Sequence, residues 1–328
     1  MKVGVVMLTY DDRAKYFVKV LARLETFAEV YRIVVVCNAI SPDSLDRLKS
    51  LNERSGKMRI HDMGYNSGSA KGFKEGLLCL KEEPIDFIWL LDDDNLPEKD
   101  SLNCLIKFWA KSNPRERELC CLLSYRPDRK LYKDAVLKQD PYLMLGPENS
   151  FLGFSLMETL KKRFSKHEAP LNPSIRKFGQ VAVAPYGGMY FQKSLLDRIG
   201  LPDENKFLYA DDHEFSYRIT KSGGKILLIL NSRIEDLEKS FHLKKGNKLL
   251  NTRYFKTESK TAIYYSVRNN VIFEQNFVTS SMVYFINKHL YLCLLLLLMM
   301  INVRHLWKFP VILNAVRAAT NISQDGPV

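Results

Sequence analysis

The 328-residue sequence has few cysteines and histidines, and their spacing excludes two common kinds of site. Its six cysteines form no Cys-x-x-Cys pair, and its six histidines show no zinc-ligand spacing to them. Zinc modules and secreted disulfide frameworks both depend on such spacings. The sequence therefore indicates neither a structural zinc site nor a disulfide-stapled fold, and a reducing, cytoplasmic setting is the simpler interpretation.

The N-terminus also lacks the pattern of a secretory signal peptide. Residues 1–10 contain one basic residue and a very short apolar run, without a small-residue cleavage site. We interpret this segment as a first β-strand.

Nucleic-acid-binding motifs are missing although positive charge is abundant. The chain has 49 Lys and Arg against 37 Asp and Glu, a net charge of +12, which suits nucleic acid, an anionic membrane surface or a polyphosphate ligand. No helix-turn-helix, zinc-finger or RNA-binding signature is visible, and the basic residues are spread along the chain. We expect no nucleic-acid partner. A non-enzymatic basic protein that binds nucleic acid or a membrane is an alternative that only the charge supports.

Buried parallel strands dominate the first hundred residues. Residues 3–8 and 33–37 are continuous apolar runs with helical spacing over 14–27 between them, and 87–91 is a third such run. Runs that are apolar on both faces are typical of central parallel strands, so we predict an α/β fold. Ligands of such sheets bind at the carboxyl ends of the strands.

The rest of the chain gives a weaker pattern. We expect a helix over 44–52, a strand over 58–61, a helix from the glycines of 64–72 to residue 81, strands over 181–185, 187–192 and 225–230, a helix over 194–200 and a final segment over 207–220. Residues 114–173 are basic, Pro-punctuated and weakly periodic, which predicts loops or an insertion rather than a core element.

Three consecutive carboxylates, Asp92, Asp93 and Asp94, follow the third strand directly. Like charges repel, so the triplet is costly unless a cation neutralises it, and a hard divalent ion with oxygen ligands would do so. Because alternate residues at a strand end point the same way, Asp92 and Asp94 could reach one ion while Asp93 faces a sugar hydroxyl. A solvated acidic turn is the usual interpretation of three acids in isolation; the strand-end position favours function.

A second acidic segment runs from Asp211 to Glu214. Acids at a helix N-terminus complement the helix dipole, and this explains the segment as well as function does. Inverting sugar transfer, however, needs a carboxylate that deprotonates the acceptor hydroxyl, besides the cation that absorbs charge on the leaving group. Two separate acidic groups suit these two tasks, so together they favour a catalytic site.

The last fifty residues change character. Residues 290–301 carry no charge, and Lys288, His289, Arg304 and Lys308 flank them. A bilayer-spanning helix needs about 20 apolar residues, so an interfacial or shallowly embedded helix is better supported. A buried helix or a dimer interface is the alternative.

Four features, in this order, resemble the family 2 glycosyltransferases of the GT-A fold. They are a first strand that ends in Thr9-Tyr10, the segment from Asn66 to Phe73, the triplet Asp92-Asp93-Asp94, and the segment from Asp211 to Phe215. The likeness covers residues 1–277. Within the family, the triplet, the acidic pair and the aromatic-then-Arg-Asn segment at 264–270 are most similar to bacterial galactofuranosyltransferases and rhamnosyltransferases.

The resemblance implies a Rossmann-like, mostly parallel mixed sheet flanked by helices and assigns roles within it. Asp212 would be the catalytic base with Asp211 beside it, and Asp92 and Asp94 would hold Mn²⁺ or Mg²⁺. The residues implied to border the donor are Thr9 and Tyr10 at the base, with Asn38, Asn66, Lys71 and Asp93.

The sequence departs from the family pattern at two positions. Asn38 stands where many members carry an Asp that grips the base. Where the galactofuranosyltransferases place a metal-binding His, this chain has Asp236, with His242 shortly after it. Either residue could complete the metal shell, and we prefer Asp236.

The resemblance, taken with the two acidic segments, implies an inverting hexosyltransferase that uses a UDP- or dTDP-sugar, with galactofuranose or rhamnose favoured. The acceptor would be a glycan or a polyprenyl-linked glycan in cell-surface polysaccharide synthesis. We expect a catalytic domain over 1–277 and a membrane-associating helical segment over 278–328, peripheral or monotopic on the cytoplasmic face of the bacterial inner membrane. A sugar nucleotidyltransferase is the alternative enzyme, but it normally has a Gly-rich basic loop after the first strand, where this chain reads Thr9-Tyr10-Asp11-Asp12-Arg13.

Overall fold

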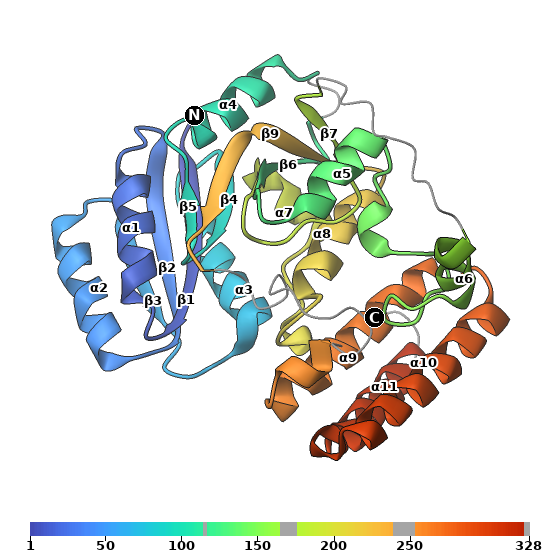
Figure 1. The fold of residues 1–328 in the computed structure, drawn as a ribbon. Coiled ribbons are helices and arrows are strands. Elements are labelled where there is room, and N and C mark those ends of the chain that lie inside the picture. Colours follow the sequence, from blue (N-terminus) through green and yellow to red (C-terminus); the bar gives the residue numbers. More distant parts are fainter. Residues whose placement is uncertain (114–116, 165–175, 239–252, 325–328) are drawn as a thin grey trace. The chain divides into compact units, whose positions relative to one another are not determined.

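A computed structural model describes residues 1–113, 117–164, 176–238 and 253–324 (Figure 1). The chain divides into two compact units. The first comprises Met1–Met144, Pro173–Phe207 and Asp211–Phe241, and the second comprises Leu145–Asn172, Leu208–Ala210 and His242–Val328. Each unit has a hydrophobic core of its own. The predicted division between residues 277 and 278 falls inside the second unit and stays a prediction about function.

The first half of the sheet is parallel and holds the predicted βαβ unit. Its strand order is β3-β2-β1-β4, and every neighbouring pair in it runs parallel. The strands are β1 (Val3–Asp11), β2 (Val30–Ile40), β3 (Met58–Asp62) and β4 (Phe87–Asp92); the helices between them are α1 (Ala14–Glu25), α2 (Pro42–Arg54) and α3 (Gly68–Lys81). Each of these elements was predicted to within a few residues.

The second half of the sheet is mixed. β8 (Met189–Gln192) runs antiparallel to both β4 and β6 (Cys120–Tyr125), and β6 pairs in parallel with β9 (Lys225–Asp236). The short strands β5 (Asn95–Pro97) and β7 (Phe178–Val181) pair antiparallel with β9. The predicted fold class, an α/β mixed sheet with parallel central strands and flanking helices, is confirmed.

Two predictions about this half were wrong. Residues 114–173 are not only loops, because all six residues of β6 are buried in the sheet. Residues 181–185 are not a strand beyond Val181. The backbone N–H of Ala182 donates to the carbonyl oxygen of Pro141, and that of Ala184 donates to the Ser216 hydroxyl, so neither group is available to a strand ladder.

Helices cover both faces of the sheet in the first unit. One core packs side chains of α1, α2 and α4 (Ser101–Lys111) against the sheet. The other core packs α3, α5 (Lys130–Lys138), α7 (Leu196–Ile199) and α8 (Asp211–Lys221) against the opposite face. In place of the predicted helix over 194–200, the structure has a short 3₁₀ turn followed by the one-turn helix α7.

The second unit is helical in the residues that the structure describes. It contains α6 (Leu156–Phe164), α9 (Lys260–Glu274), α10 (Ser281–Ile301) and α11 (Lys308–Gln324). Its core includes Phe151, Val267, Leu295 and Ile312. At 21 residues, α10 is long and apolar enough to cross a bilayer by length and composition, although a single helix of this kind is weak support for a membrane span.

Candidate functional site

Asp93 is fixed by the end of the neighbouring strand. β1 lies beside β4 in parallel register, with Leu8 opposite Asp92, so Thr9 and the acidic triplet meet at one edge of the sheet. The Thr9 hydroxyl donates to Asp93 Oδ2 at 2.7 Å, and Arg13 Nε donates to both carboxylate oxygens at 2.7 and 2.8 Å. Burial nevertheless raises the pKa of Asp93 to about 6. Asp93 is thus held by the protein itself, and Thr9 acts on it as a positioning residue.

Arg13 links this strand end to the end of β9. Its guanidinium carbon lies 4.9 Å from the ring centre of Tyr10 and 4.8 Å from that of Tyr16. Its Nη1 donates to Glu238 at 2.6 Å, and its Nη2 lies 3.7 Å from Asp94 Oδ2. Tyr10 itself is 49% exposed, so one face of this aromatic ring is open to a ligand.

Asp92 and Asp94 have environments in which a carboxylate is hard to ionise. Burial, followed by the charges of Asp92 and Asp93, raises the pKa of Asp94 to about 7. Desolvation and the nearby carboxylates of Asp236 and Asp212 raise the pKa of Asp92, against the opposing effect of Arg126. The Asp92 side chain is 38% exposed, so one of its sides faces solvent. A cation at this place would relieve the repulsion.

Asp236, one of the two predicted additional metal ligands, lies beside the triplet. Its partner in the β5–β9 pairing is Asn95, whose amide Nδ2 donates to Asp94 Oδ1 at 3.2 Å and to Asp236 Oδ1 at 3.1 Å. Arg126 Nε donates to the same Asp236 oxygen at 2.7 Å, and Arg126 Nη1 lies 3.5 Å from Asp92 Oδ2. The other oxygen, Asp236 Oδ2, is buried and has no hydrogen-bond partner among the residues that the structure describes. His242 lies outside the described residues.

The carboxylates fit a divalent ion that is coordinated partly by the protein and partly by a phosphate group. Among the residues that the structure describes, no three His, Cys, Asp or Glu side chains lie close enough together to hold an ion alone. Mg²⁺, however, is usually held by one or two carboxylates, with substrate phosphates and waters as its other ligands. Asp92 and Asp94 carry hard oxygen atoms of this kind, and together they match the number of carboxylates that such a shared site needs.

Gly187 closes the space around these groups. A Cβ atom at this position would collide with Asn95 Oδ1 and would lie 2.8 Å from both Arg126 Nη1 and Asp92 Oδ2. Any larger side chain would therefore push the carboxylate and the guanidinium apart. The backbone approaches the site closely here because the residue is glycine.

Asn38 organises the loop that precedes α3. Its Oδ1 accepts hydrogen bonds from the backbone N–H of Ser67 at 2.6 Å and from the Ser67 hydroxyl at 2.9 Å. Its Nδ2 donates to Asn66 Oδ1 and to the carbonyl oxygen of Gly68, both at 3.3 Å. The predicted donor residues Asn38 and Asn66 are thus brought together. Lys71 lies one turn into α3 and pairs with Glu204 at 3.3 Å.

The second acidic segment forms the N-terminus of α8, and its two aspartates differ sharply. Asp211 is 4% exposed, and its Oδ2 accepts a hydrogen bond from the Ser69 hydroxyl at 2.7 Å. Burial and the charge of Asp212 raise the pKa of Asp211 to about 7. Asp212 is more exposed and accepts a hydrogen bond from the backbone N–H of His213 at 2.8 Å. No Lys or Arg in the described part of the chain forms an ion pair with Asp212.

The two acidic segments lie near enough to each other to interact electrostatically. The charge of Asp212 contributes to the raised pKa of Asp92, and after burial it is the largest cause of the raised pKa of Tyr132. Arg126 also acts on the Tyr132 hydroxyl, so the strand end and the start of α8 share the same surroundings. Glu214 is not available to this site, because it forms a bidentate ion pair with Arg218, with N–O distances of 2.6 and 2.8 Å.

Sequence reasoning missed three residues of this site. Arg13 stands four residues after Thr9, and a basic residue just after the first strand was a usable signal. Arg126 follows β6, the strand that was mistaken for a loop, so its position was hidden. Gly187, in Tyr186-Gly187-Gly188, was read only as the start of a strand, and its spatial neighbours come from two other segments.

Comparison with known proteins gives a family match for the N-terminal part and a shared fold for the chain. Residues 4–139 match the family described as Glycosyl transferase family 2. No curated protein matches the chain. A mannosyltransferase from Pyrobaculum calidifontis, PcManGT, solved with GDP-Man and Mn²⁺, is similar over 100% of this chain and 76% of its own, with 13% identity and a TM-score of 0.54.

Two further solved structures give the same picture. GalNAc-T7, solved with UDP, GalNAc and Mn²⁺, matches 82% of this chain at 12% identity with a TM-score of 0.54, and the chain spans about half of it, 47%. Residues 1–349 of TarS from S. aureus, solved with UDP, match 99% of this chain and 92% of their own at 13% identity, with a TM-score of 0.50. At these identities the likenesses show a shared fold.

Proposed function

Because residues 4–139 match the glycosyltransferase family 2, we propose that the protein is a metal-dependent inverting hexosyltransferase. The donor would be a nucleoside diphosphate sugar, a UDP- or dTDP-hexose, with galactofuranose or rhamnose as the favoured sugar. The acceptor would be a glycan or a polyprenyl-linked glycan of a cell-surface polysaccharide. The observation that carries the proposal is that a crowded pair of carboxylates, Asp92 and Asp94, lies within electrostatic reach of Asp212, which forms no ion pair among the described residues.

Asp212 suits the role of the base better than Asp211 does. The Asp211 carboxylate is buried and accepts a hydrogen bond from the Ser69 hydroxyl, whereas Asp212 is partly exposed and forms no ion pair among the described residues. In the proposed step, a carboxylate oxygen of Asp212 takes the proton of the acceptor hydroxyl. The hydroxyl oxygen forms a bond to the anomeric carbon as the bond from that carbon to the diphosphate oxygen breaks, which inverts the configuration.

Asp92 and Asp94 would hold the divalent cation, Mn²⁺ or Mg²⁺, with Asp236 as a further oxygen ligand. When bound, the cation supplies charge neutralisation for the departing diphosphate. The protein contributes the geometry: Asn95 bridges Asp94 and Asp236, and Arg126 restrains Asp236 and Asp92. PcManGT and GalNAc-T7 were both solved with Mn²⁺, which supports this assignment.

Donor binding is proposed for the strand end of β1 and the loop before α3. Tyr10 offers an exposed ring for the base, while Thr9 acts through Asp93. The side-chain amide of Asn38 uses both its nitrogen and its oxygen to hold the loop of residues 66–68. We therefore propose that Asn38 shapes the donor pocket through Asn66 and Ser67. Lys71 lies next to this loop and would act on the diphosphate by its charge.

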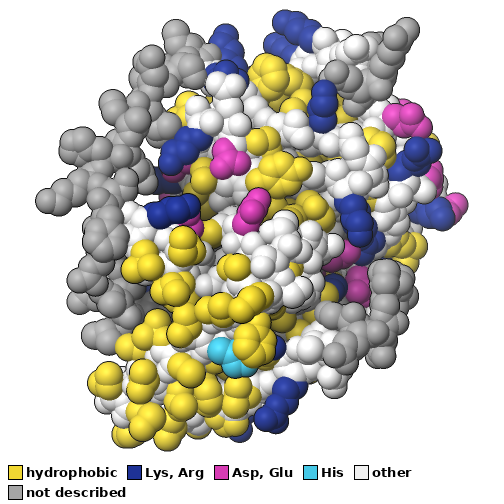
Figure 2. Space-filling model, turned by 90° about the vertical axis from the view of Figure 1, so that its right-hand side faces the viewer, with side chains coloured by type: hydrophobic (Ala, Val, Ile, Leu, Met, Phe, Trp, Pro, Cys, Tyr) yellow, Lys and Arg dark blue, Asp and Glu magenta, His cyan; other side chains and the backbone are white. Residues whose placement is uncertain are grey.

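We propose that the second unit attaches the enzyme to the cytoplasmic face of the bacterial inner membrane. Large apolar side chains of α10 are strongly exposed, among them Met282 at 75%, Phe285 at 59% and Ile301 at 78%. Figure 2 shows hydrophobic side chains gathered over these C-terminal helices. A contiguous exposed apolar surface is typical of a membrane or partner interface, and interfacial helices bury such a face among lipid headgroups.

A donor screen tests the enzymatic proposal directly. Purified protein is incubated with UDP-, dTDP- and GDP-sugars and candidate acceptors, with Mn²⁺ or with EDTA, and the released nucleoside diphosphate is measured. We expect metal-dependent release with one donor class, and loss of transfer in Asp94→Ala and in Asp212→Asn with circular dichroism unchanged. The matched control, Asp46→Asn, removes an exposed carboxylate of α2 and should retain full activity.

The outcomes separate the alternatives. Full transfer activity in either Asp94→Ala or Asp212→Asn would contradict the assignment of roles. Release of inorganic pyrophosphate would identify a nucleotidyltransferase instead. Metal-independent transfer would contradict the proposed cation at Asp92 and Asp94.

A further inference from the structure

The two C-terminal helices α10 and α11, which form a helical hairpin, contain basic residues but no acidic residues. No Asp or Glu occurs between residues 275 and 324, whereas Lys288, Arg304, Lys308 and Arg317 are basic. Lys308 is fully buried, and its ammonium group donates to the carbonyl oxygen of Thr257 at 2.8 Å and to Glu258 at 3.0 Å. The remaining basic side chains of this stretch have no carboxylate of their own segment to pair with.

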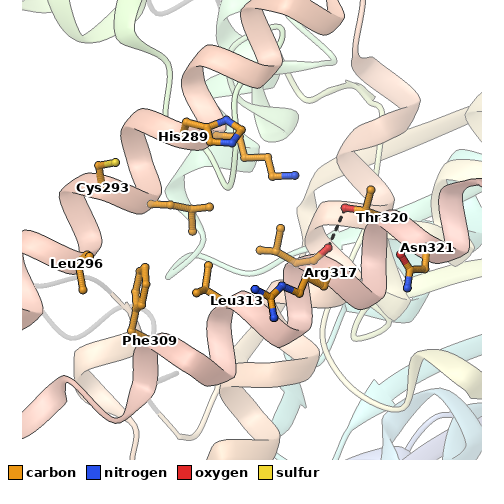
Figure 3. A pocket seen from close by; sticks show the side chains of 11 residues that line it. His289, Cys293, Leu296, Phe309, Leu313, Arg317, Thr320 and Asn321 are labelled. Carbon is orange, nitrogen blue, oxygen red and sulfur yellow. Dashed lines mark hydrogen bonds between the residues drawn. The ribbon is translucent and has the colours of Figure 1, made fainter.

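An apolar groove of about 500 Å³ lies between α10 and α11 (Figure 3). Its apolar part lies toward the turn that joins the helices, where Leu296 of α10 faces Phe309 and Leu313 of α11. Its volume is within the range of known small-molecule pockets. All of its lining residues belong to the second unit.

The far end of the same groove is basic. Lys288 and His289 of α10 line it together with Arg317 of α11. Neither Lys288 nor Arg317 forms an ion pair with any carboxylate in the described residues. The Nδ1 atom of His289 lies 2.8 Å from the carbonyl oxygen of Phe285. The other ring nitrogen, Nε2, therefore faces away from the helix backbone.

We propose that this groove binds one anionic phospholipid of the membrane, with the phosphate between Lys288 and Arg317 and one acyl chain along Leu296, Phe309 and Leu313. The two ends of the groove are complementary to a phospholipid: the basic end suits the phosphate, and the apolar end suits an acyl chain. The proposal goes beyond sugar transfer and rests on the proposed membrane location. It adds a specific headgroup site to a general apolar contact surface.

A second copy of this chain suits the groove less well than a lipid does. Two hairpins of this kind would bring basic side chains together without any carboxylate from residues 275–324 to neutralise them. Like charges in contact oppose association, whereas a phosphate between Lys288 and Arg317 removes their repulsion.

Cys293 offers a direct probe of the groove. It lines the groove and is exposed, whereas the other five cysteines are buried or half-buried. The full-length protein is alkylated with a maleimide in the presence of a short-chain, non-micellar phosphatidylglycerol or phosphatidylcholine, and modification of Cys293 is followed by mass spectrometry. We expect phosphatidylglycerol to slow the alkylation several-fold and phosphatidylcholine of the same chain length to have little effect.

Matched substitutions locate the effect. Arg317→Gln should weaken the protection by about tenfold, because it removes a charged hydrogen-bond donor to the phosphate. Arg304→Gln removes the same charge from an exposed position outside the groove and should not change it. Leu296→Trp should fill the apolar part and abolish protection, while Leu297→Trp, at a side chain that is 58% exposed outside the groove, should preserve it.

Three results would overturn the proposal. Equal protection by the two lipids would mean that no phosphate site exists, and equal weakening by Arg304→Gln and Arg317→Gln would mean only diffuse electrostatic attraction. Protection without lipid that grows with protein concentration, with dimers in light scattering, would show that a second copy fills the groove. Binding to phosphatidylglycerol vesicles without protection of Cys293 would leave the membrane location standing while refuting the groove, and sugar transfer to a soluble acceptor is measured independently of both.

Discussion

Arg126→Met should separate the electrostatic support of the site from its chemistry. The Arg126 side chain is 4% exposed and donates to Asp236, whose side chain is 1% exposed, at 2.7 Å. It also lies 3.5 Å from Asp92. Methionine keeps most of the volume of the side chain but removes the charge, so the substitution leaves Asp236 as a buried carboxylate without its cationic partner.

The expected loss of stability follows from this burial. Removing one partner of a buried ion pair costs about 3–5 kcal/mol, mainly because the remaining charge is left uncompensated. For a unit of this size, that loss lowers the melting temperature by roughly 6–20 °C. In the double variant Arg126→Met/Asp236→Asn, no uncompensated charge remains at these two positions, and we expect most of the lost stability to return.

The measurement is urea unfolding in EDTA, followed by circular dichroism, for the wild type, both single variants and the double variant. This double-mutant cycle isolates the interaction between the two side chains. A loss below about 1 kcal/mol for Arg126→Met, as for an exposed pair, would refute the reasoning. So would a double variant that is no more stable than Arg126→Met.

Two further predictions concern the same unit. Gly187→Ala should lower the rate of sugar transfer by about a hundredfold, because a displacement near 1 Å at the reacting groups has that effect. The control Gly56→Ala, at a position with open space around it, should keep the wild-type rate, and equal rates for the two variants would contradict the close approach at Gly187. Burial raises the pKa of Asp211 to about 7, so its protonated form stabilises the fold and this contribution is lost as the pH rises through about 7. Between about pH 4, near the pKa of an unfolded aspartate, and about pH 7, the wild type should therefore lose melting temperature relative to Asp211→Asn; parallel curves over this range would contradict this.

Much of the sheet could be predicted because its strands are long apolar runs. β1, β2 and β4 are buried on both faces, and such runs separated by helical spacing leave little choice of topology. Because β1 and β4 run parallel in the structure, their carboxyl ends, with Thr9 and Asp92, meet at the edge of the sheet where ligands were expected. The sequence therefore located the acidic triplet correctly at a strand end.

The groups that hold the carboxylates could not be predicted in this way. The contact of Arg126 with Asp236 joins residues 110 apart, and Arg126 directly follows β6, a strand of only six residues inside a basic stretch. A buried arginine becomes recognisable only when its neighbours in space are known, because in sequence it looks like any surface cation. The space beside Gly187 has the same origin, since strands β4 and β6 shape it from outside its own segment.

The packing between the start of α3 and the approach to α8 has an evolutionary consequence. Gly68 leaves no room for a Cβ against the Phe207 carbonyl, the N–H of Ala70 donates to that carbonyl at 3.3 Å, and Ser69 holds Asp211. The loop proposed to shape the donor pocket and the helix that carries the base therefore cannot diverge independently. Among natural relatives, residues at 68 and 69 should covary with those at 207 and 211, so a change of donor would arise through paired substitutions.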